Sequence, residues 1–360
     1  MEDIFSPKGL LDNAAAANIV AVLSEKVPSI IDFGGVTGMD FPALRTLIRA
    51  RQSGKLFMII NLSDEVAGFL DTTGASGILG ACRRPREISL EGMTPTGGSF
   101  TAETYDYGED SLLKVYFDFI PPQVAIIEKM TSRAALQFGL HTPIPGDLMV
   151  CGKRFGVVYE RIRNKRSFAR AISQEPENLE KYAVRFAAMS RELHATRCDV
   201  ALFPDRTQTY RNAIAANSVY TDAEKKIMYD FIDSAPKSET CIHGDLHMGN
   251  VITNGTDDLW IDLGDFSYGN PLWDIAMTYF ICCINPIEEM TLDLFHMTVP
   301  QVREFWRIFA REYFGADTDA GQQEIHEMMK PYAAIQIVLL SEKKTFPFME
   351  AYVRKNLLGQ

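Results

Sequence analysis

The feature that most constrains the fold is a polar loop set between apolar runs at residues 241–250, with the sequence CIHGDLHMGN. It places a carboxylate, Asp245, five positions before a carboxamide, Asn250, and the apolar residues that follow predict a strand. Phosphoryl transfer needs a group that orients the attacking hydroxyl, and oxygen ligands for the Mg²⁺ that neutralises the phosphates. Asp245 suits the first task and Asn250 suits the second.

A second polar cluster follows the loop at a spacing that predicts a hairpin. Asn254 and Gly255 form a dipeptide typical of tight turns between antiparallel strands. The return strand at residues 259–261 then delivers Asp262 and places its carboxylate beside Asn250 across the hairpin. Two oxygen-bearing side chains on facing strands form a suitable site for one metal ion.

The HGDxxxxN loop and the IDLGD segment that follows it resemble the catalytic loop and metal segment of the aminoglycoside phosphotransferase and choline-kinase family. Residues 266–276 resemble that family's continuation. The resemblance implies a bilobed, protein-kinase-like α+β fold and a phosphotransferase that uses ATP or GTP. It implies Asp245 as the catalytic base, with Asn250 and Asp262 as the Mg²⁺ ligands.

Other polar residues near these motifs are expected to be structural. The resemblance implies that Asp274 bonds to the catalytic loop. His243 is expected to be a structural member of that loop, because Asp245 already fills the role of base. His194 is expected to cap or pack a helix. The six histidines show no spacing typical of a zinc site.

A kinase-like lobe also needs a lysine that binds the phosphates and a carboxylate that orients the lysine. Lys114 lies in a predicted strand at residues 112–116, and Glu128 lies on a helix predicted over residues 124–137. Alone, a strand lysine is more often an exposed surface residue. The order of strand lysine, helix glutamate and catalytic loop favours a Lys114–Glu128 pair in the catalytic site.

The glycine-rich stretch at residues 94–102 resembles the loop that covers the phosphates in kinases, although it lacks a full GxGxxG pattern. Gly97 and Gly98 let backbone amides approach phosphate oxygens, and Ser99 adds a hydroxyl. An ordinary hairpin turn is the alternative interpretation. The position just before Lys114 favours the phosphate loop.

Residues 156–162 look like the last strand of the smaller lobe and the hinge that follows it. Backbone groups from Glu160 to Ile162 are then expected to bind the purine. Side chains at the hinge do not distinguish adenine from guanine, so ATP and GTP both remain open as donors.

Before these motifs, strand and helix patterns alternate and predict a small α/β layer with parallel strands. Residues 10–80 resemble a STAS domain, the fold of anti-sigma-factor antagonists. That family usually carries a phosphorylatable serine just after an aspartate, whereas Asp40 is followed here by Phe41 and Pro42. A docking or self-association module and a structural support for the smaller lobe are both compatible with this region.

The sequence therefore predicts three regions. These are a STAS-like domain over 1–82, a kinase-like N-lobe over 88–162 and a mostly helical C-lobe over 163–360. Residues 83–86, which are rich in arginine and contain Pro85, are expected to be a linker.

A net charge of −11 and a pI near 5.1 argue against nucleic acid as the main partner, because phosphate backbones favour basic surfaces. Such a charge attracts cationic substrates, and equally keeps a protein soluble. The sequence shows no apolar run of about 20 residues that would span a membrane. We see no signal-peptide pattern and no CxxC pair among the six cysteines, so a cytoplasmic location is expected.

We expect a kinase that phosphorylates a hydroxyl of a small molecule. Acidic residues near the motifs could hold an amine-bearing acceptor such as an aminoglycoside or choline, or could simply be solvated: Asp265, Glu288, Glu289 and Asp293. The alternatives are a protein kinase, or a nucleotide-binding regulatory module that works through the STAS-like domain. Only twelve positions separate Asp262 from Asp274, which leaves little room for a segment that holds a peptide.

Overall fold

The computed structural model describes residues 4–23, 29–55, 57–99, 101–198, 200, 203–284, 288–341 and 346–360. The chain forms two compact units, a mixed α/β unit and a mostly helical one. The first contains Met1–Ile162 and Asp199–Pro204, and the second contains Arg163–Cys198 and Asp205–Gln360. Each unit is described by itself.

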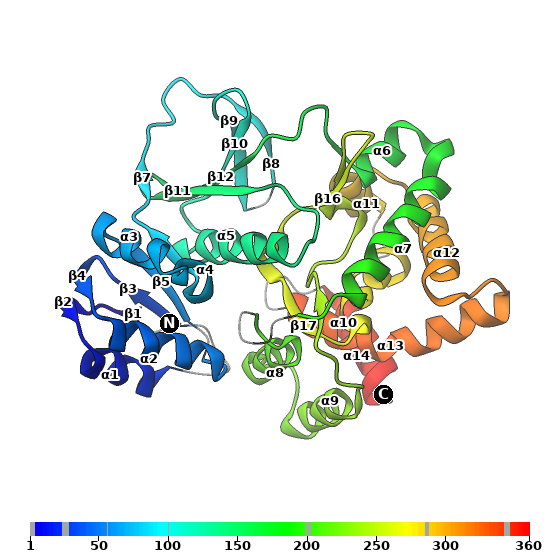
Figure 1. Cartoon of the computed structure of the whole chain (residues 1–360). Coiled ribbons are helices and arrows are strands. Elements are labelled where there is room, and N and C mark those ends of the chain that lie inside the picture. Colours follow the sequence, from blue (N-terminus) through cyan, green and yellow to red (C-terminus); the bar gives the residue numbers. More distant parts are fainter. Residues whose placement is uncertain are drawn as a thin grey trace. The chain divides into compact units, whose positions relative to one another are not determined.

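The N-terminal module, which we define as residues 4–83, is a parallel sheet with the strand order β1-β3-β5-β6 (Figure 1). The predicted parallel α/β layer is thus confirmed. A separate two-stranded parallel ladder joins β2 (Lys8–Leu11) to β4 (Gly35–Met39). The sheet strands are β1 (Ile4–Phe5), β3 (Ser29–Asp32), β5 (Phe57–Leu62) and β6 (Ala81–Arg83).

The first three helices of this module begin where short polar side chains cap them. Asp12, Asp40 and Ser63 accept hydrogen bonds from the backbone of the first turns of these helices. The helices are α1 (Asn13–Val22), α2 (Phe41–Gln52), α3 (Asp64–Thr72) and α4 (Ala75–Leu79). The identification as a STAS domain stays a prediction.

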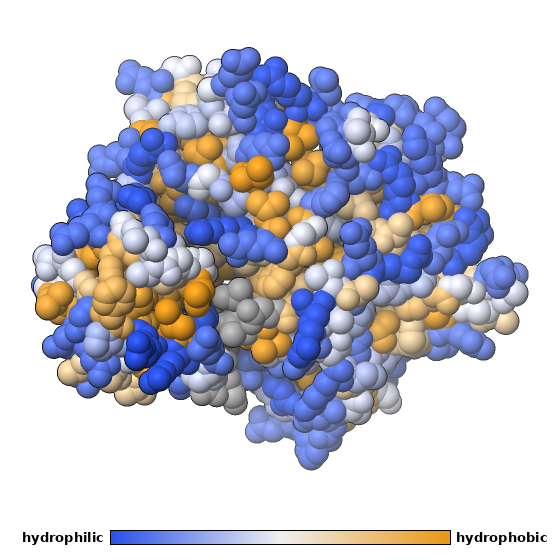
Figure 2. Space-filling view, in the orientation of Figure 1, coloured by the Kyte–Doolittle hydropathy of each residue, from blue (hydrophilic) through white to orange (hydrophobic). Residues whose placement is uncertain are grey.

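Apolar side chains remain exposed on the N-terminal module, and Figure 2 shows hydrophobic residues gathered on its surface. The large exposed ones are Leu10, Val22, Phe41 and Ile78. A protein partner or self-association at this module stays a proposal.

The linker predicted at residues 83–86 is largely wrong. Arg83 ends β6, and β7 (Arg86–Glu87) already pairs with a strand of the next sheet. Only Arg84 and Pro85 therefore connect the two sheets. The prediction failed because short edge strands rich in arginine carry no apolar signal.

The second sheet has the order β7-β11-β12-β10-β9-β8 and is antiparallel except for the β7–β11 pair. One helix, α5 (Pro122–Gln137), follows β10, where a helix over 124–137 was predicted. The strands are β8 (Pro95–Gly98), β9 (Ala102–Asp106), β10 (Ser111–Tyr116), β11 (Pro145–Cys151) and β12 (Arg154–Glu160).

The second unit is mostly helical, as predicted. Its helices are α6 (Phe168–Gln174), α7 (Leu179–Ala195), α8 (Arg206–Ala216), α9 (Asp222–Ser234), α10 (Pro271–Tyr279), α11 (Glu288–Phe295), α12 (Val299–Phe314), α13 (Asp319–Ser341) and α14 (Pro347–Val353). No helix in the described ranges combines the length and apolar character needed to cross a membrane.

Two small ladders interrupt these helices and carry the polar loop. The first pairs β14 (Thr240–Ile242) with β17 (Ser267–Gly269). The second has the order β13-β15-β16, formed by β13 (Arg166–Ser167), β15 (Val251–Thr253) and β16 (Asp258–Trp260). The hairpin predicted at Asn254-Gly255 is confirmed, since β15 and β16 are antiparallel and Gly255 adopts φ +96°.

Candidate active site

The polar loop runs from the end of β14 to the start of β15 and closes on itself through Asn250. The Nδ2 atom of Asn250 donates to the backbone oxygen of Asp245 at 2.9 Å and to its Oδ2 at 3.1 Å. The backbone N–H of Asn250 donates to the His247 carbonyl at 2.9 Å. The side-chain NH₂ group of Asn250 donates both of these hydrogen bonds to Asp245. Its other polar atom, Oδ1, is an acceptor and is the atom suited to a cation.

The β15–β16 hairpin holds Ile261, the residue before Asp262, opposite Asn250, and the pairing of the Asp262 and Asn250 side chains stays a prediction. The backbone N–H of Ile261 donates to the Asn250 carbonyl at 3.0 Å, which fixes the residue before Asp262 directly opposite Asn250. Asp262 itself adopts φ +58° and ψ +53°, in the left-handed region. Non-glycine residues in such conformations are concentrated at functional sites.

Two histidines surround the Asp245 carboxylate. His243 Nδ1 accepts from the Asp245 N–H at 3.3 Å and its Nε2 lies 3.0 Å from the Ile261 carbonyl, so the ring proton belongs on Nε2. His247 Nδ1 accepts from the Gly249 N–H at 3.0 Å, and its Nε2 lies 3.5 Å from Asp245 Oδ2. The predicted structural role of His243 is confirmed.

The ionisation state of the Asp245 side chain depends on its surroundings. Its side chain is 34% exposed. Burial raises its pKa, but His247 and His243 and the hydrogen bond from Asn250 outweigh burial and hold the pKa well below the usual 3.8. The group is therefore ionised at neutral pH.

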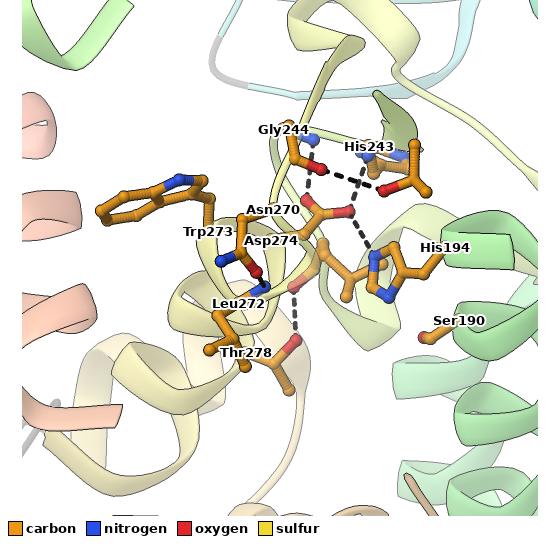
Figure 3. A network of polar contacts seen from close by, with 12 residues as sticks. Ser190, His194, His243, Gly244, Asn270, Leu272, Trp273, Asp274 and Thr278 are labelled. Carbon is orange, nitrogen blue, oxygen red and sulfur yellow. Dashed lines mark hydrogen bonds and ion pairs between the residues drawn. The ribbon is translucent and has the colours of Figure 1, made fainter. Parts of the chain in front are cut away.

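Asp274, in the first turn of α10, anchors the loop from below (Figure 3). Its Oδ1 accepts from the Gly244 N–H at 2.8 Å and its Oδ2 from the His243 N–H at 2.6 Å. The expected bond between Asp274 and the loop is confirmed. His194 packs against α12 through the Tyr313 ring, as expected, and it also makes two hydrogen bonds that the sequence did not predict. Its Nε2 lies 3.1 Å from Asp274 Oδ2 and its Nδ1 lies 2.7 Å from the Tyr313 hydroxyl.

Arg206 holds the same loop from its carbonyl side. Its Nη2 donates to the Gly244 carbonyl at 2.7 Å, and the residue is only 2% exposed. Burial lowers the pKa of the guanidinium, but Tyr210 and Asp265 outweigh burial and raise it, so the charge is retained. Arg206 was missed from the sequence because 38 positions separate it from Gly244 and no motif connects them.

Both the backbone conformation of residue 244 and the lack of space for a side chain there require glycine. It adopts φ +85°, and a Cβ there would lie 2.0 Å from the Asp265 carbonyl oxygen. We expect Gly244→Ala to lower the free energy of unfolding by about 3 kcal/mol and to impair the loop. The matched control is Gly255→Ala, which has φ +96° but nothing within 4 Å. This substitution should lower the free energy of unfolding only by the cost of a side chain in the left-handed conformation, about 1 kcal/mol. Urea unfolding of both variants checks the prediction, and equal losses would contradict it.

The structure also brings together Lys114 on β10 and Glu128 on α5, in the first unit. Lys114 Nζ lies 2.8 Å and 3.0 Å from the two carboxylate oxygens of Glu128, and both side chains are largely buried. The hydroxyls of Tyr116 and Tyr159 also donate to this carboxylate. Burial, and then the negative charge of Glu128, raise the pKa of Tyr159 well above its usual value, so its hydroxyl stays a donor.

The glycine-rich stretch is the β8–β9 hairpin. Gly97 and Gly98 are exposed at the end of β8. The Ser99 N–H donates to the Ala102 carbonyl at 2.8 Å, and the Ser99 hydroxyl oxygen accepts from the Thr101 N–H at 3.3 Å. The backbone is therefore a hairpin, and its role over phosphates stays a prediction.

The hinge follows β12. The N–H of Glu160 donates to the Ile144 carbonyl at 2.9 Å, and the N–H of Arg161 donates to the Asp110 carbonyl at 3.0 Å. These two donors are used within the protein. Binding of a purine by the remaining backbone groups of residues 160–162 stays a prediction.

Among the described residues, no group of three or more His, Cys, Asp or Glu side chains could hold a metal ion. Asn250 Oδ1 and the Asp262 carboxylate nevertheless fit Mg²⁺, which takes one or two protein oxygens and completes its shell with phosphates and water. These residues belong to the second unit, whereas Lys114 and Glu128 belong to the first.

The chain is similar to several solved structures, while no curated protein matches it. A choline/ethanolamine kinase family protein from Mesorhizobium loti is 16% identical, with 74% of this chain and 86% of that chain covered and a TM-score of 0.43. The aminoglycoside phosphotransferase APH(2″)-IIa, solved with streptomycin and ATP, is 16% identical (74% and 91% covered, TM-score 0.46). A thermostable mutant of APH(4)-Ia with ADP and hygromycin B is 13% identical (73% and 93% covered, TM-score 0.49).

A family match covers part of the chain. Residues 145–309 match the phosphotransferase enzyme family. This segment contains Glu160, Ile162, Asp245, Asn250 and Asp262, while Lys114, Glu128 and the β8–β9 hairpin precede it. Over the segment that carries the polar loop and the β15–β16 hairpin, this chain is therefore similar to phosphotransferases.

Proposed function

We propose that this protein transfers the γ-phosphate of ATP or GTP to a hydroxyl of a small molecule. The observation that carries the proposal is the closed loop in which Asn250 bonds to Asp245, with Ile261, the residue before Asp262, held opposite Asn250 by the hairpin. A base and metal ligands close to one another are what phosphoryl transfer requires. The match of residues 145–309 to phosphotransferases supports the same reaction.

Each residue takes a separate role in this proposal. Asp245 accepts the proton of the attacking hydroxyl and orients its oxygen. Asn250 Oδ1 and the Asp262 carboxylate hold Mg²⁺, which supplies positive charge to the phosphate oxygens when bound. Lys114 binds the phosphates, and Glu128 orients the lysine side chain. The buried ion pair between Lys114 and Glu128 supports these roles.

In the same proposal the first unit also binds the nucleotide through the glycine-rich stretch and the hinge. The amides of Gly97 and Gly98 and the hydroxyl of Ser99 cover the phosphates, and the backbone of the hinge from Glu160 to Ile162 holds the purine. Neither set of groups selects adenine over guanine.

A small acceptor is favoured over a protein. The stretch between Asp262 and Asp274 is filled by a short 3-10 helix at Leu263–Asp265, by β17 and by the first turn of α10. It leaves no extended segment on which a peptide would lie. A protein kinase therefore remains the weaker candidate, and a protein substrate belongs in the test.

The proposed class of phosphate acceptor rests only on the negative charge of exposed side chains. Asp265 and Asp293 are exposed carboxylates of the second unit, which would favour an amine-bearing acceptor such as an aminoglycoside or choline. Asp293 is on α11, and Phe295 of that helix packs its ring at 5.2 Å from the His247 ring. The side chains of Glu288 and Glu289 lie outside the described residues.

The test is Mg²⁺-dependent phosphate transfer from ATP and from GTP across aminoglycosides, choline, amino alcohols, sugars and a generic protein. Asp262→Asn should remove Mg²⁺-dependent transfer to the acceptor. Asp257→Asn is the matched control, because Asp257 is an exposed carboxylate in the turn of the same hairpin. Transfer that is unaffected by Asp262→Asn would refute the metal assignment, and transfer only to the protein would replace the small-molecule proposal.

A further inference from the structure

The two faces of the N-terminal parallel sheet pack against different parts of the first unit. Successive residues of a strand point to opposite faces. Ile31 on β3 and Ile59 on β5 belong to the core formed with α1 to α4. Their neighbours Ile30 and Met58 belong to a second core, shared with α5 and the antiparallel sheet. The sheet is thus covered on one face by the element that carries Glu128.

The contact with α5 extends along the helix. Ala125 and Ile126 share the second core with Ile30 and Met58. Further along α5, Met130 approaches the C-terminal end of α4 so closely that a Cβ on Gly80 would lie 2.2 Å from its Cε. The N-terminal module therefore contacts α5 from Ala125 to Met130.

The same core reaches the ion pair. Tyr116 and Tyr159 belong to it, together with Ile30 and Met58, and both donate their hydroxyls to the Glu128 carboxylate. Glu128 is 6% exposed, so its position depends on this packing rather than on solvent. Protein interiors are close-packed, and a change in one wall of such a core displaces the groups packed on it.

We propose that the N-terminal module is a positioning element for nucleotide binding. Ile30 and Met58 form the wall on which α5 rests, and they thereby hold Glu128 at 2.8 Å from Lys114. The proposal rests on the proposed function, in which Lys114 binds the phosphates. It gives the module a role in the reaction without any residue of the module touching a substrate.

Two adjacent isoleucines provide the test in the full-length chain. Ile30 and Ile31 are 1% and 0% exposed and lie on opposite faces of the same strand. Ile30→Ala should raise the KM and Kd for nucleotide by about fivefold or more, with the acceptor KM unchanged. Ile31→Ala removes the same atoms from the other core, so it should lower stability similarly and leave the nucleotide constants unchanged. Ile30→Val should restore most of the nucleotide affinity.

A second measurement does not depend on nucleotide. Hydrogen exchange of the α5 amides should become faster in Ile30→Ala than in Ile31→Ala. Equal α5 exchange and equal nucleotide Kd in the two variants would overturn the inference. If the wild-type chain bound no nucleotide, the proposed function would fail, while the α5 exchange would still decide whether the module holds this helix. If an alanine variant does not fold, Ile30→Val and Ile31→Val are compared in the same way.

Discussion

Asp245→Ala is expected to lower the rate constant of phosphate transfer by about 10²- to 10⁴-fold, the usual contribution of a general base. The carboxylate is the group in the closed loop that can accept a proton from a hydroxyl. Nucleotide affinity should change little, because the proposed nucleotide contacts lie in the first unit and at the metal ligands. Steady-state kinetics and a nucleotide-binding titration, run on the same preparation, separate the two effects.

The control for this variant is Asp230→Asn, which changes an exposed carboxylate on α9 whose partner is Lys226. It should leave the rate unchanged. The depressed pKa of Asp245 also predicts that its titration causes no loss of rate as pH falls from 8 to 5. Full turnover by Asp245→Ala, or a strong loss in Asp230→Asn, would disprove the assignment of the base.

Asp274→Ala is expected to have the largest effect on stability. The substitution removes the acceptor of two buried backbone N–H groups, those of His243 and Gly244, and the partner of His194. Breaking a buried charged network in this way costs about 3–5 kcal/mol. For a unit of this size the melting temperature should fall by roughly 10 °C. Calorimetry of both proteins measures this fall, and transfer activity should fall with it.

The pH dependence of this loss identifies its cause. Burial raises the pKa of Asp274, but the bonds from His194 and His243 outweigh burial and lower it below the usual 3.8. A carboxylate with a depressed pKa stabilises the fold above its unfolded-state pKa and loses that effect as pH falls through the folded-state pKa. The stability difference between wild type and Asp274→Ala should therefore be constant near neutral pH and shrink below about pH 4.

A surface pair supplies the comparison for Asp274. Asp233, whose side chain is 65% exposed, pairs with Arg211. Asp233→Ala should change stability by less than about 1 kcal/mol, as exposed ion pairs usually do. A similar small change in Asp274→Ala would mean that the loop does not depend on this anchor.

Local features of the fold were predictable from the sequence because their signals are local. Ser63 precedes a helix at its cap position, and Asn254-Gly255 lies between two apolar runs, so each could be read within a few residues. The Lys114–Glu128 contact followed from the order of motifs, and the anchoring role of Asp274 followed from the resemblance to a known family. For the helix cap and the hairpin, a short stretch of chain determines the geometry.

Long-range contacts could not be predicted in this way. Arg206 reaches Gly244 from a helix 38 positions earlier, and His194 meets Asp274 from 80 positions away. The apolar run on β5 indicates burial on both faces, but nothing in it shows that α5 covers one of them. Which partner covers an apolar face depends on the whole topology.

The left-handed backbone of Asp262 has a consequence for how this protein can be improved. Glycine occupies that conformation without the steric cost that a side chain brings, about 1 kcal/mol. Melting temperature alone would therefore register the relief of this backbone cost in Asp262→Gly, but not the loss of a metal ligand of the proposed reaction. The backbone conformation at position 262 favours glycine, whereas the proposed metal site needs aspartate. Stability screening of this protein therefore has to be paired with a turnover assay.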